Sequence, residues 1–114
     1  MPRISPEARQ MYRREMTAAA TAADSHARWR HLERAHIVSQ PDPWLHTCNH
    51  AAMLKLALHQ HDRREALGQV LRLIVAAPGS LTGRYPVGNI GRVDAGLMTP
   101  MAIPDDLAAA LASH

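Results

Sequence analysis

A proline turn in the first half of the chain sets its architecture: Ser39-Gln40-Pro41-Asp42-Pro43. Neither proline can donate the backbone hydrogen bond that an uninterrupted helix requires, so one helix has to end before this turn. Asp42 can accept hydrogen bonds from the free N–H groups of a new helix, and Pro43 suits the first turn of that helix. The turn therefore predicts helices over 25–39 and 43–60 that form an antiparallel hairpin.

Capping residues predict further helices on both sides of this hairpin. Ser5 precedes a helix over 6–20, Asp24 caps the helix over 25–39, and Asp62 caps a helix over 63–77. Pro78-Gly79 should stop the last of these helices. Pro104 and the two acids after it predict a short terminal helix through about residue 111.

Apolar residues recur at three- and four-residue spacing, which is typical of helices packed around a core. In the first helix these residues are Ala8, Met11, Tyr12, Met16 and Ala19. The densest apolar face, in the helix over 63–77, comprises Leu67, Val70, Leu71, Ile74 and Val75. We expect this helix to be central, with Leu67, Leu71 and Ile74 buried against Leu32 or Leu56.

The predicted fold class is all-α: a small bundle of about four helices, packed like tetratricopeptide hairpins, with an irregular C-terminal arm and a short terminal helix. The 114 residues suit a single domain. Within it we expect a helical bundle over 1–78, a glycine- and proline-rich arm over 79–103 that wraps across the helices, and a C-terminal helix over 104–114. A 34-residue repeat is not visible twice, so a solenoid is not predicted.

Composition and charge exclude several classes of protein. No run approaches the ~18 apolar residues that a membrane span needs. A single cysteine, Cys48, and a start without a secretory signal favour the cytoplasm. The net charge is +3, but acidic residues are interleaved with the arginines. This pattern is typical of a solvated surface, and we expect no nucleic-acid partner.

Four side chains around the proline turn predict a metal site: Glu33, His36, His46 and His50. Each pair, Glu33 with His36 and His46 with His50, has a spacing that places both members on one face of a helix. In an antiparallel hairpin centred near Pro41, residues whose numbers sum to about 82 lie opposite each other. His36 should therefore face His46, and Glu33 should lie near the level of His50.

Three imidazoles and one carboxylate suit zinc, nickel, cobalt or copper, whereas calcium and magnesium prefer oxygen ligands. We predict that His36, His46 and His50 bind such an ion, with Glu33 as a fourth ligand or an outer partner. A nitrogen of His36 should then lie ~3 to 5 Å from one of His46 or His50. The alternative is that these are ordinary surface histidines, because chance pairs are common among eight histidines.

The remaining motifs favour structural roles over catalysis. Glu33 and His36 have the Glu-x-x-His spacing of di-iron bundles, but no second such motif exists. The segment 79–91 lacks the Gly-Lys-Ser/Thr end of a phosphate loop. We predict no catalytic residue and leave enzymatic activity open. The alternative function is a metal-free protein-interaction adaptor, whose arginine-rich first two helices meet an acidic partner; a protein partner or a homo-oligomer is compatible with either function.

An ordered series of short motifs runs from about Asp24 to Leu107. It includes Arg30-His31-Leu32-Glu33-Arg34-Ala35-His36-Ile37, then Arg64-Glu65-Ala66-Leu67-Gly68-Gln69, then Gly83-Arg84-Tyr85-Pro86-Val87-Gly88-Asn89-Ile90-Gly91. This series resembles the bacterial family catalogued as domain of unknown function 3703. Genes of that family tend to stand beside genes for heavy-metal efflux and sensing, so the resemblance implies a compact single-domain protein of heavy-metal handling or resistance. It implies no activity and no set of ligands.

Overall fold

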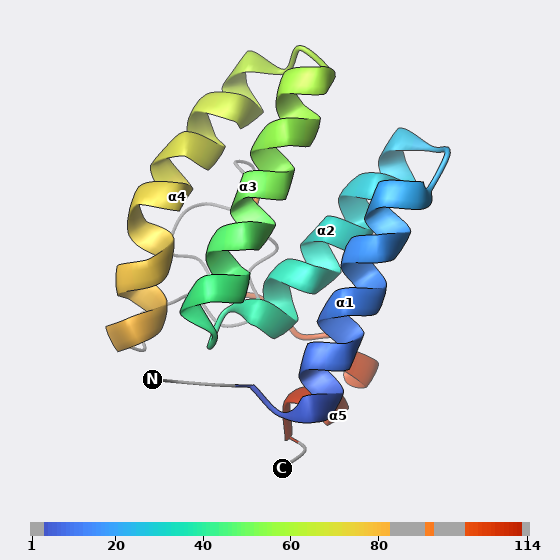
Figure 1. The fold of residues 1–114 in the computed structure, drawn as a ribbon, viewed down its shortest axis with the longest axis vertical. Helices are drawn as coiled ribbons and strands as arrows, with labels where there is room; N and C mark the ends of the chain where they lie inside the picture. Colours follow the sequence, from blue (N-terminus) through green and yellow to red (C-terminus); the bar gives the residue numbers. More distant parts are fainter. Residues whose placement is uncertain (1–3, 83–90, 93–99, 113–114) are drawn as a thin grey trace.

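The computed structural model describes residues 4–82, 91–92 and 100–112, and these contain only helices and their connections. The helices are α1 (Pro6–Thr21), α2 (Ser25–Ser39), α3 (Pro43–His59), α4 (Arg63–Thr82) and α5 (Asp105–Ala112) (Figure 1). The prediction of an all-α fold is confirmed. None of the described helices is both long enough and apolar enough to cross a membrane.

Side-chain caps begin the helices where the sequence predicts them. The hydroxyl of Ser5 accepts a hydrogen bond from the backbone N–H of Ala8 at 3.1 Å. The carboxylate of Asp42 accepts bonds from the N–H groups of Trp44 and Leu45, both at 3.1 Å. These acceptors satisfy N–H groups that have no partner within the helix, so helix starts can be read from local chemistry.

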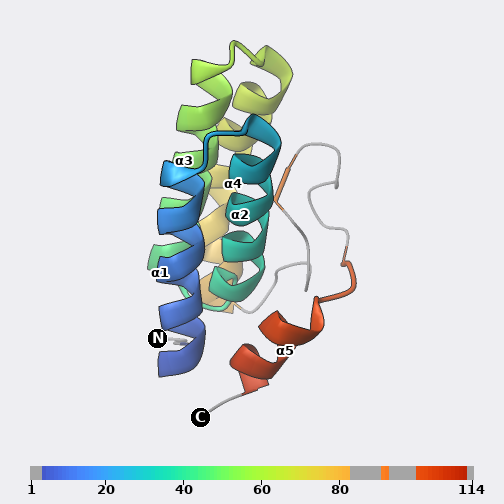
Figure 2. The same cartoon turned by 90° about the vertical axis from the view of Figure 1, so that its right-hand side faces the viewer.

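Two helical hairpins form the body of the protein, α1 with α2 and α3 with α4 (Figure 1). Helices α2 and α3 join the hairpins; they meet at the proline turn and run antiparallel, farther apart at their other ends (Figure 1). Helix α5 lies across the end of the first hairpin (Figure 2). There the hydroxyl of Ser5 donates a hydrogen bond to the carbonyl of Ala110 at 2.9 Å.

Two apolar clusters hold the helices together. One includes Trp29, Leu32, Met53, Leu56 and Ala57, and the other includes Tyr12, Ala35, Ile37, Val38 and Leu107. These residues lie on α1, α2, α3 and α5, and Ala66 of α4 also belongs to the first cluster. Burial of each large side chain contributes about 1.5 to 3 kcal/mol, so these clusters dominate the stability of the protein.

The prediction that α4 forms the centre of the core is wrong. Leu67, Leu71 and Ile74 are 73%, 48% and 68% exposed. Among the side chains of α4 that the structure describes, those of 63–74, the buried ones are instead Glu65, Ala66, Gln69 and Arg72, three of which are polar. Periodicity shows which residues share a face of a helix, but it does not show which face packs inward.

Helix α4 also continues past Pro78 and Gly79 to Thr82, so the prediction that these residues stop the helix is wrong. A proline removes only the hydrogen bond of its own nitrogen, and the bonds on either side of it can continue the helix. The first residues of the predicted arm over 79–103 therefore belong to α4. The predicted wrapping of the arm falls mainly on 83–90 and 93–99, which lie outside the described residues.

Candidate metal centre

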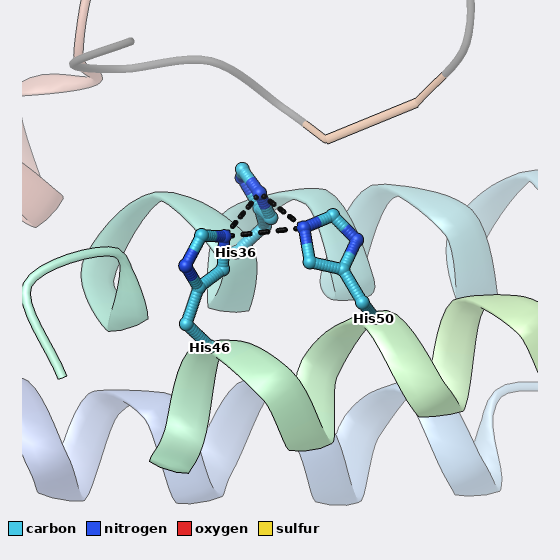
Figure 3. A group of neighbouring side chains, drawn as sticks. All are labelled: His36, His46 and His50. Atoms are coloured by element: carbon cyan, nitrogen blue, oxygen red, sulfur yellow. Dashed lines mark hydrogen bonds between the residues drawn. The ribbon is translucent and has the colours of Figure 1, made fainter. Parts of the chain in front are cut away.

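Three histidines converge beside the proline turn. His36 lies in the last turn of α2, and His46 and His50 lie one turn apart on α3. Their Nε2 atoms form a triangle in which each nitrogen is 3.1 Å from the other two (Figure 3). The predicted distance between His36 and its partners across the hairpin is therefore confirmed.

The histidine cluster is buried, with His36, His46 and His50 only 2%, 5% and 2% exposed. The rings do not stack: the planes of His36 and His46 are 69° apart, and those of His36 and His50 are 73° apart. The rings therefore meet through their nitrogen atoms, in a part of the protein where water has little access.

Protons alone cannot satisfy a triangle of three Nε2 atoms. In a neutral imidazole each nitrogen is either a donor or an acceptor, and a hydrogen bond joins one donor to one acceptor. Among three mutually close nitrogens, at least two have the same role, so at least one of the 3.1 Å contacts pairs two donors or two acceptors. A cation between the nitrogens removes this conflict, because all three can offer it their lone pairs.

Gln69 of α4 determines which nitrogen of His50 carries the proton. The side-chain nitrogen of Gln69 donates to Glu65 Oε2 at 2.8 Å and to the carbonyl of Gly91 at 2.9 Å. Its oxygen, which can only accept, lies 2.6 Å from Nδ1 of His50. His50 therefore donates from Nδ1, and its Nε2 presents a lone pair to the centre of the cluster. Partners of this kind orient histidines at metal sites.

Burial lowers the pKa of His50 to about 4, because desolvation penalises the charged imidazolium. The positive charge of Arg72 lowers this pKa further, whereas the hydrogen bond with Gln69 and the charge of Glu65 raise it. His50 is therefore neutral at neutral pH, and neutral imidazole is the form that binds metal ions.

Gly91 closes the site over His36. Its backbone has a φ of +87°, and a β-carbon at this position would lie 2.5 Å from Cδ2 of His36. Only glycine combines this backbone conformation with so close an approach to the ring. Helix α4 holds the segment in place through Gln69, and through Arg72, whose Nη2 donates to the carbonyl of Arg92 at 3.2 Å.

The structure places Glu33 outside the three converging nitrogens. Its carboxylate lies 3.4 Å from Nη1 of Arg92, whose Nε donates to Glu65 at 3.1 Å. The guanidinium of Arg92 also stacks over Trp29, 3.9 Å from the ring centre. Burial raises the pKa of Glu33, and Arg92 opposes that rise. Because α2 and α3 diverge away from the turn, Glu33 does not meet His50 as the ideal hairpin predicts.

The three nitrogens can hold a transition-metal ion. His36, His46 and His50 would hold such an ion, because the usual zinc–nitrogen distance of about 2.0 to 2.1 Å is compatible with nitrogens that lie 3.1 Å from one another. Three protein ligands are fewer than the four of a closed structural zinc site.

Sequence reasoning missed the residues that support the histidines: Glu65, Gln69, Gly91 and Arg92. Glu65 and Gln69 carried a usable signal, because together with Arg72 they recur at four- and three-residue spacing and so form a polar stripe on one face of the helix. Gly91 and Arg92 carried none, because their role depends on a contact between distant parts of the chain.

These features define a small all-helical protein with a buried cluster of three histidines. Residues 6–111 match the model of a family described as protein of unknown function (DUF3703). The match covers most of the chain, so the protein belongs to this family, and the resemblance noted from the sequence is confirmed. No curated protein and no solved structure matches the chain.

Proposed function

We propose that this protein binds one transition-metal ion through the Nε2 atoms of His36, His46 and His50. The observation that supports this most is the buried triangle of nitrogens, 3.1 Å on each side, which no arrangement of protons satisfies. Gln69 supports the same conclusion, because it directs a lone pair of His50 into the triangle.

The donor set favours zinc, nickel, cobalt or copper, since imidazole nitrogen suits these ions and the cluster offers no oxygen ligand among the described residues. Structural zinc sites usually have four protein ligands, whereas three leave room for an exchangeable one. A site of this kind fits a cytoplasmic protein that takes up and releases metal in heavy-metal handling or resistance. No catalytic step is proposed.

Glu33 takes an outer role in this proposal. Its carboxylate contacts Arg92, which in turn contacts Glu65 beside Gln69. Glu33 therefore helps to hold the residues that orient His50, and we do not propose that it is a direct ligand. Its removal should weaken binding less than removal of any one histidine.

Calorimetry on protein without a histidine tag tests the proposal. We expect about one zinc, nickel, cobalt or copper ion per chain with micromolar or better affinity, and a loss of at least ~100-fold in His46→Ala. His26→Ala is the matched control, because His26 is exposed and lies outside the cluster. A wild-type protein that binds none of the four ions at this stoichiometry would refute the metal site.

A stability measurement gives an independent check. A ligand that binds only the folded state stabilises it by mass action, by ~2.7 kcal/mol at a hundredfold excess over the dissociation constant. The increment should appear in wild type and His26→Ala and should be absent from His46→Ala. An equal increment in all three proteins would mean that the metal binds elsewhere.

One observation favours a contact between proteins, which is compatible with the metal site and with the metal-free adaptor alike. Leu67, Val70, Leu71 and Ile74 share one face of α4 and are between 45% and 73% exposed. Exposed apolar faces of this kind are typical of contacts between proteins. For this chain the simplest contact is with a second copy, and sedimentation of wild type beside Leu71→Gln tests it. A wild-type monomer at high concentration would count against self-association through α4.

A further inference from the structure

A hollow separate from the histidine cluster lies between α1, α2 and α3, on the side where α2 and α3 diverge. It has a volume of about 600 Å³ and a predominantly apolar lining, and the apolar residues that line it are Met16, Ala19, Ala20, Leu32, Ala52 and Leu56. None of the three histidines of the metal centre lines it. We call this hollow the alanine trough.

The alanine trough exists because small side chains stand where the helices separate. Ala19 and Ala20 on α1 and Ala52 on α3 line the same hollow, and a methyl group cannot fill the space that opens between diverging helices. Leu32 and Leu56 at its base belong to the apolar core and are 4% and 9% exposed. The result is a concave apolar surface in the size range of small-molecule sites, about 300 to 1,000 Å³.

The polar side chains that line the alanine trough are all basic. Arg28 at the start of α2, and Lys55 and His59 near the end of α3, complete its lining, and no acidic residue is among the described residues that line it. Nε of Arg28 donates to the carbonyl of Ala22 at 2.6 Å, which anchors the guanidinium and leaves its Nη atoms as further donors. An apolar floor with a cationic rim is complementary to an amphiphilic anion.

We propose that the alanine trough binds a single-chain amphiphilic carboxylate, of the chemical class of a medium-chain fatty acid. The hydrocarbon tail lies along the alanines, where it replaces water over an apolar surface. The carboxylate lies at the rim, where Arg28 can hold it with charge-assisted hydrogen bonds and Lys55 adds a second positive charge. This proposal does not depend on the metal site.

Calorimetry with sodium decanoate, below its aggregation concentration, tests the proposal on metal-free protein. We expect binding at one site per chain, and much weaker binding of decanol and of decyltrimethylammonium, which share the tail but lack the negative charge. Lys55→Gln should weaken decanoate binding roughly tenfold, the effect of losing one charge-assisted interaction. Because Lys55 is exposed, this variant keeps the fold.

Two alanine variants separate the trough from general binding to apolar surface. Ala52→Leu fills the trough and should abolish decanoate binding, whereas Ala51→Leu adds the same side chain at an exposed neighbour outside the trough and should leave binding unchanged. His46→Ala should bind decanoate as wild type does, so failure of the metal site leaves this result intact. The proposal is overturned if decanoate does not bind, if decanol binds equally well, or if a folded Ala52→Leu variant retains wild-type affinity.

Discussion

Replacement of Gln69 by methionine separates the role of this residue in metal binding from the role of the histidines themselves. Methionine has a similar length and volume but cannot accept the hydrogen bond from Nδ1 of His50, which is 2.6 Å long in the structure. Without that acceptor, the proton of His50 can move to Nε2, and a protonated Nε2 cannot bind an ion. Loss of such an outer partner typically weakens metal binding 10- to 100-fold, about 1.4 to 2.7 kcal/mol.

The same substitution should destabilise the metal-free protein by ~2 to 4 kcal/mol, since it removes partners from several buried polar groups at once. Gln69 bonds not only His50 but also Glu65, at 2.8 Å, and the carbonyl of Gly91, at 2.9 Å. The assays are urea unfolding without metal and zinc affinity by competition with a chelating dye. Gln10→Met, on the exposed face of α1, is the control. If folded Gln69→Met binds zinc within about twofold of wild type, Gln69 does not position His50.

Three further predictions follow from the same contacts. Gly91→Ala should lower the free energy of unfolding in urea by ~1 to 3 kcal/mol and should weaken zinc binding, because the added β-carbon would lie 2.5 Å from His36. A wild-type stability together with a wild-type zinc affinity would contradict the close approach of Gly91 to His36. Met53→Ala should lower the free energy of unfolding by ~2 to 5 kcal/mol, whereas Leu71→Ala should lower it by less than ~0.5 kcal/mol, because Met53 is fully buried and Leu71 is 48% exposed. Equal losses for the two variants in denaturant titration would mean that Leu71 is buried in the core after all. The free energy of unfolding of the metal-free protein should fall by roughly 3 kcal/mol between pH 6.5 and pH 4. The pKa of His50 is about 4 in the folded protein and ~6.5 in the unfolded chain, so the unfolded chain binds more protons in that pH range. If the free energy of unfolding falls by the same amount in wild type and in His50→Gln, His50 is not the cause.

The helix starts and the pairing across the proline turn could be predicted because both depend on groups close in the sequence. Asp42 caps α3 with its own side chain, and the two bonds involved span no more than three residues. His36 meets His46 because few residues separate them from the turn, so small errors in the angle between the helices have little effect. Since His50 lies one helical turn farther along α3, the spacing of the three histidines is enough to group them in one candidate site.

The angle between α2 and α3 decided the position of Glu33, and no local pattern encodes that angle. Its carboxylate lies one turn farther from the proline turn than His36, where the helices have separated and Arg92 contacts it instead. The orientation of α4 could not be predicted from the sequence either, since Leu67, Val70, Leu71 and Ile74 share a face that remains exposed, while Gln69 faces His50. Caps and turns can be predicted because they depend on residues that are neighbours in the chain. The angle between two helices, and the face that each helix turns toward the core, depend on contacts among residues that are distant in the sequence, and those contacts exist only in the folded protein.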